Sequence, residues 1–281
     1  MARARASVRV SLCTITFRHH LLGIGDIAAF ARRAGFDGIE LWGAHARNLG
    51  PGEHRAWLSA QGLAVPMLSD YLPLDAEKDR FLSHIEELVE LARLWGAPRV
   101  RTFAGSKGSA ATSAEERAFL SRRLREAATR FGDRGLRLLV ETHPGTLADN
   151  LASLLRLLED AADPALRVNY DTLHVWEGGD DPLLAHEKLA EHVDYYHLKN
   201  VRSRSDLGVF SPANVYAAAG CRTGMTSLFE GALDYRRFLR ALPSDIEASL
   251  EWFGNRCQSV LESDLRAVRQ RSRVAPLQAM G

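Results

Sequence analysis

A short apolar run ends in two polar side chains that could carry out chemistry. Residues 136–142 read LRLLVET, and His143 follows directly, before a Pro-Gly pair. An apolar run of this length is typical of a buried strand, whereas a buried carboxylate or imidazole needs a partner. Residues two apart on a strand face the same side, so Glu141 and His143 are expected to project together from the strand end.

Other apolar runs end in the same way. Their final residues include acidic, basic and imidazole side chains, which are uncommon in a buried strand. They are Arg101 in the run 99–105, Asp171 and then His174 at the end of 166–172, His197 and Lys199 in 193–199, and Glu251 in 248–254.

Four of these residues, Glu141, Asp171, His197 and Glu251, come one each from four successive runs. Carboxylates gathered in one apolar cup repel each other and are costly to ionise unless a cation neutralises them. Three carboxylates with one imidazole suit Mn²⁺, Mg²⁺ or Co²⁺ better than tetrahedral zinc. The pattern predicts a metal site, and the alternative is four unrelated structural polar groups.

Two further acidic residues lie near this pattern. Glu230, in LFEGALDY, competes with Glu251 as a ligand, but it lies in a loop before Asp234, which is expected to cap the next helix. Glu40, in the run GIELW, could also face the site, but a structural role is the favoured expectation.

The residues above need a scaffold that brings strand ends together. Helical patterns alternate with the apolar runs, and in the helix at 79–96 the residues Phe81, Ile85, Leu88, Ala92 and Trp95 recur near a period of 3.6. In the helix at 146–160, Thr146 and Asp149 resemble a capping box. The eight runs are 8–14, 38–42, 63–69, 99–105, 136–142, 166–172, 193–199 and 248–254.

Strands that alternate with helices indicate a parallel sheet, and eight of them in this length predict an α/β fold, a single (β/α)8 TIM barrel. The active sites of such barrels lie at the carboxyl ends of the strands, where the polar residues are found. An open doubly wound sheet is the alternative, but no G-x-G-x-x-G follows a strand.

Composition restricts the classes of partner. The 281 residues are 46% hydrophobic and 25% charged, with a net charge of +1, so no global field favours nucleic acid or an anionic membrane. No run reaches the length of a membrane span, and the basic amino terminus lacks the apolar core of a secretory signal. Three cysteines without a CxxC pair fit a reducing cytoplasm. The sequence does not determine the oligomeric state, and a homo-oligomer is possible.

We expect one barrel domain over residues 1–281, with 1–7 as a flexible basic arm and 271–281 as a flexible tail. Residues 201–233 form a long connection without clear periodicity. Long connections in compact domains are usually functional, and this one is apolar enough to pack, so we expect a lid.

Several strings resemble a known family. They include SLCTITFRHHL, GIELWGAHARNL, RTFAGSKGS, LVETHPGTLAD, NVYAAAGCRTGM and ASLEWFG, spread from about Ser11 to Phe253. The chain resembles the xylose-isomerase-like barrels, a superfamily of metal-dependent sugar isomerases and epimerases. Within it, the strings are most similar to the bacterial 3-dehydroshikimate dehydratases, which make 3,4-dihydroxybenzoate (protocatechuate), in particular for petrobactin-type siderophores.

The resemblance implies a metal-dependent lyase acting on a small carboxylate, with one divalent ion per chain, Mn²⁺ for preference. It implies that Glu141, Asp171, His197 and Glu251 bind the metal. It also implies that Tyr71, Arg101, His143, His174, Lys199 and Phe253 surround the substrate.

The chemistry of the substrate agrees with these roles. Arg101 offers a bidentate partner to the carboxylate, and His143 is a base for the proton on C4. The resulting enediolate expels the C5 hydroxyl as water, and loss of a C6 proton makes the ring aromatic. Lys199 and His174 are equal candidates for the acid. A metal-dependent ketose isomerase or epimerase is the alternative function.

Overall fold

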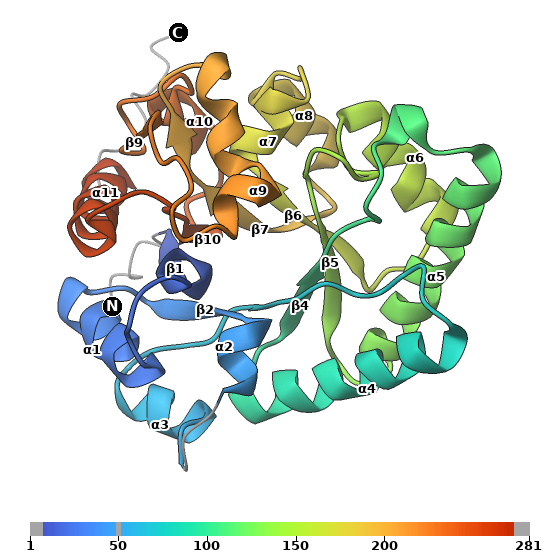
Figure 1. The fold of residues 1–281 in the computed structure, drawn as a ribbon, viewed down its shortest axis with the longest axis horizontal. Helices are drawn as coiled ribbons and strands as arrows, with labels where there is room; N and C mark the ends of the chain where they lie inside the picture. Colours follow the sequence, from blue (N-terminus) through green and yellow to red (C-terminus); the bar gives the residue numbers. More distant parts are fainter. Residues whose placement is uncertain (1–7, 49–51, 273–281) are drawn as a thin grey trace, which may run out of the picture.

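Eight strands close into a parallel barrel in the computed structural model, which describes residues 8–48 and 52–272 (Figure 1). Each strand pairs in parallel with both neighbours, so this sheet has no free edge. The predicted barrel is confirmed and the open doubly wound alternative is wrong. In order around the barrel, the strands are β1 (Arg9–Cys13), β10 (Glu247–Leu250), β7 (Val193–Leu198), β6 (Leu166–Asp171), β5 (Arg137–Glu141), β4 (Arg99–Thr102), β3 (Leu68–Ser69) and β2 (Gly38–Trp42).

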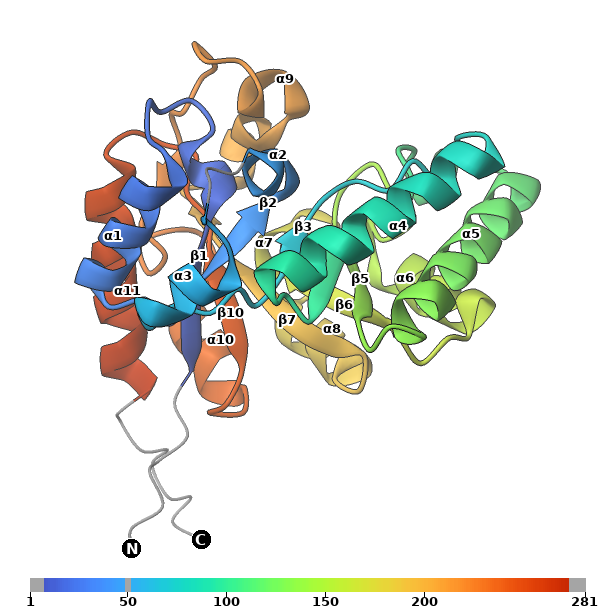
Figure 2. The ribbon, with the colours of Figure 1, turned by 90° about the horizontal axis from the view of Figure 1, so that it is seen from below.

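Helices connect the strands and cover the outside of the barrel (Figures 1 and 2). They are α1 (Ile24–Ala34), α2 (Gly43–Arg47), α3 (Arg55–Ala60), α4 (Lys78–Trp95), α5 (Ala114–Gly132), α6 (Leu151–Ala161), α7 (Thr172–Glu177), α8 (Pro182–Leu189), α9 (Pro212–Val215), α10 (Tyr235–Ala241) and α11 (Cys257–Ser272), with 3₁₀ segments η1 (Thr14–Phe17), η2 (Ser109–Ala111) and η3 (Arg204–Phe210). Among the described residues, no helix has both the length and the apolar character that crossing a bilayer requires.

The predicted arm and tail fall mostly outside the description. Residues 1–7 and 273–281 lie outside the described residues. The first two residues of the predicted tail, 271 and 272, belong to α11, so the helix continues further than the sequence suggested.

The predicted helical stripe at 79–96 is confirmed in α4. Its five core positions are all buried: Phe81, Ile85, Leu88, Ala92 and Trp95. Burying each large apolar side chain stabilises the fold by roughly 1.5–3 kcal/mol. Gly96 ends the helix in the left-handed conformation, with a φ of +71°, and its N–H donates to the carbonyl of Ala92.

The predicted start of the next helix is wrong. Helix α6 begins at Leu151, and Asn150 caps it by accepting a hydrogen bond from the Ser153 N–H at 2.9 Å. The Thr146 hydroxyl instead donates to the carbonyl of His143 at 2.8 Å. It therefore closes the turn that follows β5, and this turn delays the helix.

The amino-terminal end of the barrel interior is filled by ion pairs and packed side chains. Arg99, at the start of β4, places Nε 2.9 Å from Oδ2 of Asp194 and Nη1 2.5 Å from Oε2 of Glu247. Next to them Met67, Leu139 and Tyr195 form a fully buried cluster. This filling leaves the carboxyl ends of the strands as the end where a site can open.

The connection at 201–233 contains short helical segments rather than long ones. It begins with β8 (Asn200–Val201), which pairs with β9 (Met225–Thr226) in an antiparallel ribbon outside the barrel. Between these two strands the chain forms η3 and α9. In Figure 2, α9 lies on the side of the barrel to which the carboxyl ends of β1 and β2 point.

Candidate metal and substrate site

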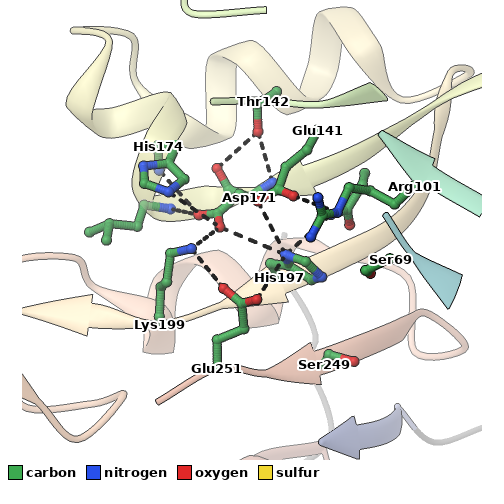
Figure 3. A network of polar contacts seen from close by, with 12 residues as sticks. Ser69, Arg101, Glu141, Thr142, Asp171, His174, His197, Lys199, Ser249 and Glu251 are labelled. Carbon is green, nitrogen blue, oxygen red and sulfur yellow. Dashed lines mark hydrogen bonds and ion pairs between the residues drawn. The ribbon is translucent and has the colours of Figure 1, made fainter. Parts of the chain in front are cut away.

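Three carboxylates surround one imidazole at the ends of four adjacent strands (Figure 3). Glu141 ends β5, Asp171 ends β6, His197 lies near the end of β7 and Glu251 directly follows β10. Nδ1 of His197 lies 3.4 Å from Oε1 of Glu141, 3.6 Å from Oε1 of Glu251 and 3.9 Å from Oδ2 of Asp171. All four side chains are buried. Parallel pairing of the strands brings these four residues to the same height along the barrel axis, and Asp171 is in register with His197.

The other nitrogen of the same imidazole contacts a residue that the sequence did not place here. Nε2 of His197 lies 3.0 and 2.9 Å from the two carboxylate oxygens of Glu40, on β2. The hydroxyl of Ser69, on β3, donates to Oε1 of Glu40. Glu40 is fully buried and lies at the site, so the less favoured of the two expectations for it holds.

Two buried cations contact the three carboxylates. Nζ of Lys199 lies 2.6 Å from Oδ2 of Asp171 and 2.7 Å from Oε2 of Glu251, and Nε of Arg101 lies 2.9 Å from Oε2 of Glu141. The Arg101 and Lys199 side chains are each about 3% exposed.

The formal charges of this cluster favour a divalent cation. Four carboxylates, those of Glu40 and the three strand-end acids, face the cations Arg101 and Lys199 and the imidazole of His197, so negative charge is in excess even when the imidazole is protonated. Oδ2 of Asp171 and Oε2 of Glu141 are buried, and each is in contact with a cation, Lys199 or Arg101, as an ion pair. Oxygen atoms of this kind are the ligands that hard divalent cations prefer, so the residues present fit such an ion.

The pKa values in the cluster agree with ionised ligands. Burial raises the pKa of Glu251, but the charges of Lys199 and His197 outweigh it and hold the pKa below the usual value. The pKa of Glu141 is likewise held well below its usual value, because Arg101 and His197 outweigh burial. Burial lowers the pKa of His197, but the surrounding carboxylates raise it well above its usual value. Carboxylates must be ionised to bind a metal, and these are.

A cavity opens beside the cluster and contains His143. Its imidazole lies between the rings of Phe103, at 4.2 Å, and His174, at 4.6 Å. Nδ1 of His143 lies 2.7 Å from the carbonyl oxygen of Pro144. A carbonyl can only accept, so Nδ1 carries the proton and Nε2 keeps its lone pair. Burial, and next the charge of His174, lower the pKa of His143 to about 3, so the ring is neutral near pH 7.

His174 also has one nitrogen fixed by a neighbour. Its Nδ1 lies 2.7 Å from Oε2 of Glu177, one turn along α7. Its Nε2 lies 3.9 Å from Oδ2 of Asp171, on the side of the cluster. The carboxylate of Glu177 therefore fixes the orientation of the imidazole beside the three strand-end acids.

The segment at 201–233 covers the cavity. Four of its residues contribute to the lining: Phe210, Pro212, Val215 and Tyr216. The hydroxyl of Tyr216 lies 2.9 Å from that of Tyr71, which follows β3 on the barrel. Two phenols thus connect the covering segment to the barrel across the cavity.

The sequence matches the family model of xylose isomerase-like TIM barrels over residues 28–272. The chain belongs to this family.

A curated protein and a solved structure are each similar to this xylose isomerase-like barrel over nearly its full length. A 3-dehydroshikimate dehydratase from Bacillus anthracis is 42% identical over 274 residues, which cover 94% of this chain and 98% of the relative. The crystal structure of a probable 3-dehydroshikimate dehydratase involved in petrobactin synthesis, from the same organism, matches with a TM-score of 0.89 and 42% identity, covering 93% of this chain and 98% of that one. These findings confirm the family resemblance that the sequence strings indicated.

A more distant structure shares the fold. The IolI protein with a bound zinc atom matches with a TM-score of 0.73 and 12% identity, covering 94% of this chain and 96% of that one. At this identity the likeness concerns the barrel alone.

Within this xylose isomerase-like barrel, the cavity brings together most residues that the sequence singled out. Its lining includes Tyr71, Arg101, Glu141, His143, His174, Lys199, Glu251 and Phe253. His197 and Asp171 lie just beneath it. Glu230 lies elsewhere, in an exposed loop, so the geometry favours Glu251 over it.

Sequence reasoning missed three residues at this site, Phe103, Glu177 and Tyr216, and it favoured a structural role for Glu40. Phe103 and Glu177 could have been found from the sequence. Phe103 follows Arg101 by two positions in the run 99–105, and Glu177 follows His174 by three positions, which is a helical spacing. Tyr216 comes from the long connection, whose path over the barrel no local pattern specifies.

Proposed function

We propose that this chain is a metal-dependent 3-dehydroshikimate dehydratase that forms 3,4-dihydroxybenzoate (protocatechuate). The observation that carries the proposal is its 42% identity, over 94% of its length, to a protein named for that activity. The Arg101 guanidinium on the cavity lining supports it, because such a group can pair with the carboxylate of the substrate.

The proposed metal ligands are Glu141, Asp171, His197 and Glu251, and Mn²⁺ is the proposed ion, with Mg²⁺ or Co²⁺ as substitutes. Such an ion supplies Lewis-acid chemistry, which makes a proton next to a carbonyl group more acidic.

The remaining residues bind and orient the substrate. Arg101 is proposed to hold the carboxylate, since its guanidinium lies over the rings of Tyr71 and Phe103, at 5.1 and 4.9 Å, on the cavity wall. Phe253 also lines the cavity, and Nζ of Lys199 lies 5.7 Å from the centre of its ring. These aromatic side chains form apolar walls against which a six-membered ring can pack.

Proton transfer is assigned to the two neighbouring imidazoles. Nε2 of His143, which holds the lone pair, is proposed to accept the proton from C4. His174 is proposed to protonate the hydroxyl on C5, which then leaves as water, and loss of a proton from C6 completes the aromatic ring. We favour His174 over Lys199 as the acid because two carboxylates already engage the Lys199 ammonium group.

The proposed setting is petrobactin-type siderophore synthesis in the cytoplasm. The name of the Bacillus anthracis structure supports the pathway, and Cys13, Cys221 and Cys257, all free, support a reducing compartment.

The test uses purified protein treated with a chelator. We expect no conversion of 3-dehydroshikimate by the metal-free protein, and restored formation of a catechol carboxylate, followed by its absorbance, on addition of Mn²⁺. Full activity in protein shown to be metal-free by elemental analysis would contradict metal dependence. A metal-loaded protein that epimerises ketoses but leaves 3-dehydroshikimate unchanged would favour the isomerase alternative.

A further inference from the structure

Glu40 reaches the site from a strand that supplies no other proposed ligand. It lies on β2, which is separated from the His197 strand, β7, by β1 and β10 in the closed sheet. Its carboxylate therefore contacts His197 across the barrel interior, at 2.9 and 3.0 Å from Nε2. Among the described residues, no lysine or arginine forms an ion pair with Glu40, and His197 is its only ionic partner.

The two nitrogens of His197 have different surroundings. Nε2 faces the Glu40 carboxylate, which can only accept a hydrogen bond, so Nε2 carries a proton. Nδ1 faces the three strand-end carboxylates and lies 3.2 Å from the side-chain amide nitrogen of Asn169, which donates. Nδ1 is therefore the unprotonated nitrogen, and its lone pair is the one that can bind the proposed ion.

We propose that Glu40 is a positioning residue, which fixes the tautomer and the orientation of His197 so that Nδ1 binds the metal. The proposal rests on the metal-dependent function proposed above. Histidine ligands commonly donate their second N–H to a carboxylate, and loss of that partner typically weakens metal binding 10- to 100-fold. Neither Glu40 nor Ser69 touches the substrate cavity, so both act through His197.

Ser69 extends the same arrangement by one residue. Its hydroxyl donates to Oε1 of Glu40, and both side chains are fully buried. A buried carboxylate with a hydroxyl donor on one oxygen has little freedom to rotate. Ser69 thus holds Glu40, and Glu40 holds His197.

Ser249 offers a matched control. It is also fully buried and lies beside His197 in the strand register, but its hydroxyl contacts the Tyr195 hydroxyl, at 2.8 Å, instead of Glu40. Figure 3 shows Ser69 and Ser249 near His197, on two different strands. A Ser→Ala change at the two positions removes the same atoms from the same kind of environment.

The test measures Mn²⁺ affinity of chelator-treated protein by calorimetry, without substrate, in Glu40→Gln, Ser69→Ala and Ser249→Ala. We expect Glu40→Gln to bind Mn²⁺ roughly 10- to 100-fold more weakly. Ser69→Ala should show a smaller loss and Ser249→Ala none. If Glu40→Gln fails to fold, as judged by circular dichroism, the two serine variants still test the proposal. Equal Mn²⁺ affinities in Ser69→Ala and Ser249→Ala would contradict it.

The outcomes separate this inference from the proposed function. Wild-type Mn²⁺ affinity in a folded Glu40→Gln overturns the role of Glu40 even if the enzyme dehydrates 3-dehydroshikimate. A protein that binds Mn²⁺ with the expected pattern but leaves 3-dehydroshikimate unchanged supports Glu40 and contradicts the dehydratase.

Discussion

Three imidazoles in the site each have one nitrogen occupied by an acceptor. His143 faces a backbone carbonyl, His174 faces Glu177 and His197 faces Glu40. Each acceptor fixes a proton on one nitrogen and leaves the other nitrogen for the site. The three roles proposed for these imidazoles, those of base, acid and ligand, therefore go with three different neighbours.

The role of His143 can be tested by removing its ring. A positioned base contributes typically 10²- to 10⁴-fold, so we expect His143→Ala to lose at least ~100-fold in kcat. The variant should bind Mn²⁺ like the wild type and should no longer exchange the C4 hydrogen with deuterated solvent. His186→Ala, at a histidine on α8 that contacts Tyr196, is the control. Undiminished exchange with metal bound would assign the base to another residue, with His174 the next to test.

The role of Arg101 can be separated from its contact with Glu141. Arg101→Lys keeps a cation beside that carboxylate but loses the bidentate fork. A charge-assisted contact is worth about 1.5–3 kcal/mol, so kcat/KM should fall roughly 10- to 150-fold, mostly through KM. Arg123→Lys, at an arginine that stacks on Phe81 at 4.6 Å, is the control. An unchanged KM would place the carboxylate elsewhere, with Lys199 and Arg222 the next candidates.

At the scale of elements, strands and helices with a strong period were predictable. All eight apolar runs became barrel strands, and the stripe of α4 is buried as expected. The predicted run at 63–69 yields only the two-residue strand β3, because Pro66 has no N–H to donate to a sheet. The start of α6 was mistaken because Thr146 and Asn150 are both residues that cap helices, although Asn is the stronger cap by residue type.

The site was predictable where the signal is local. Residues at the ends of apolar runs could be grouped, because a barrel brings those ends together. The role of Glu40 could not be read, since its partner lies across the barrel and its neighbours in the sequence are apolar. The path of the covering segment could not be predicted either, because the contact of Tyr216 with Tyr71 joins residues far apart in the chain.

At the scale of the whole molecule, one buried carboxyl group makes the stability depend on pH. Asp264, on α11, is 8% exposed and accepts a hydrogen bond from the Leu228 N–H at 3.1 Å. Burial raises the pKa of Asp264 to about 7, and Glu230 adds to the rise. Between about pH 4 and pH 7, the folded chain therefore binds this proton more tightly than the unfolded chain does, so stability falls as the pH rises through that range.

This dependence can be measured by urea unfolding at pH 5 and pH 8. We expect the wild type to lose about 2 kcal/mol more unfolding free energy between these two pH values than Asp264→Asn does, because asparagine keeps an acceptor but does not ionise. Comparing the two proteins cancels the contributions of the other titrating groups. The same loss in both would show that Asp264 does not titrate in this range.

The pairing of β1 with β10 has a consequence for the chain as it is being made. These strands come from opposite ends of the sequence, and Arg9 and Glu247 form an ion pair where they meet. Until the ribosome has released β10, a nascent chain presents open strand edges that can pair with other chains. Glu251 follows β10, so the same short segment that removes those edges also completes the proposed ligand set. Chains that stall before it are expected to aggregate rather than accumulate as folded, inactive enzyme.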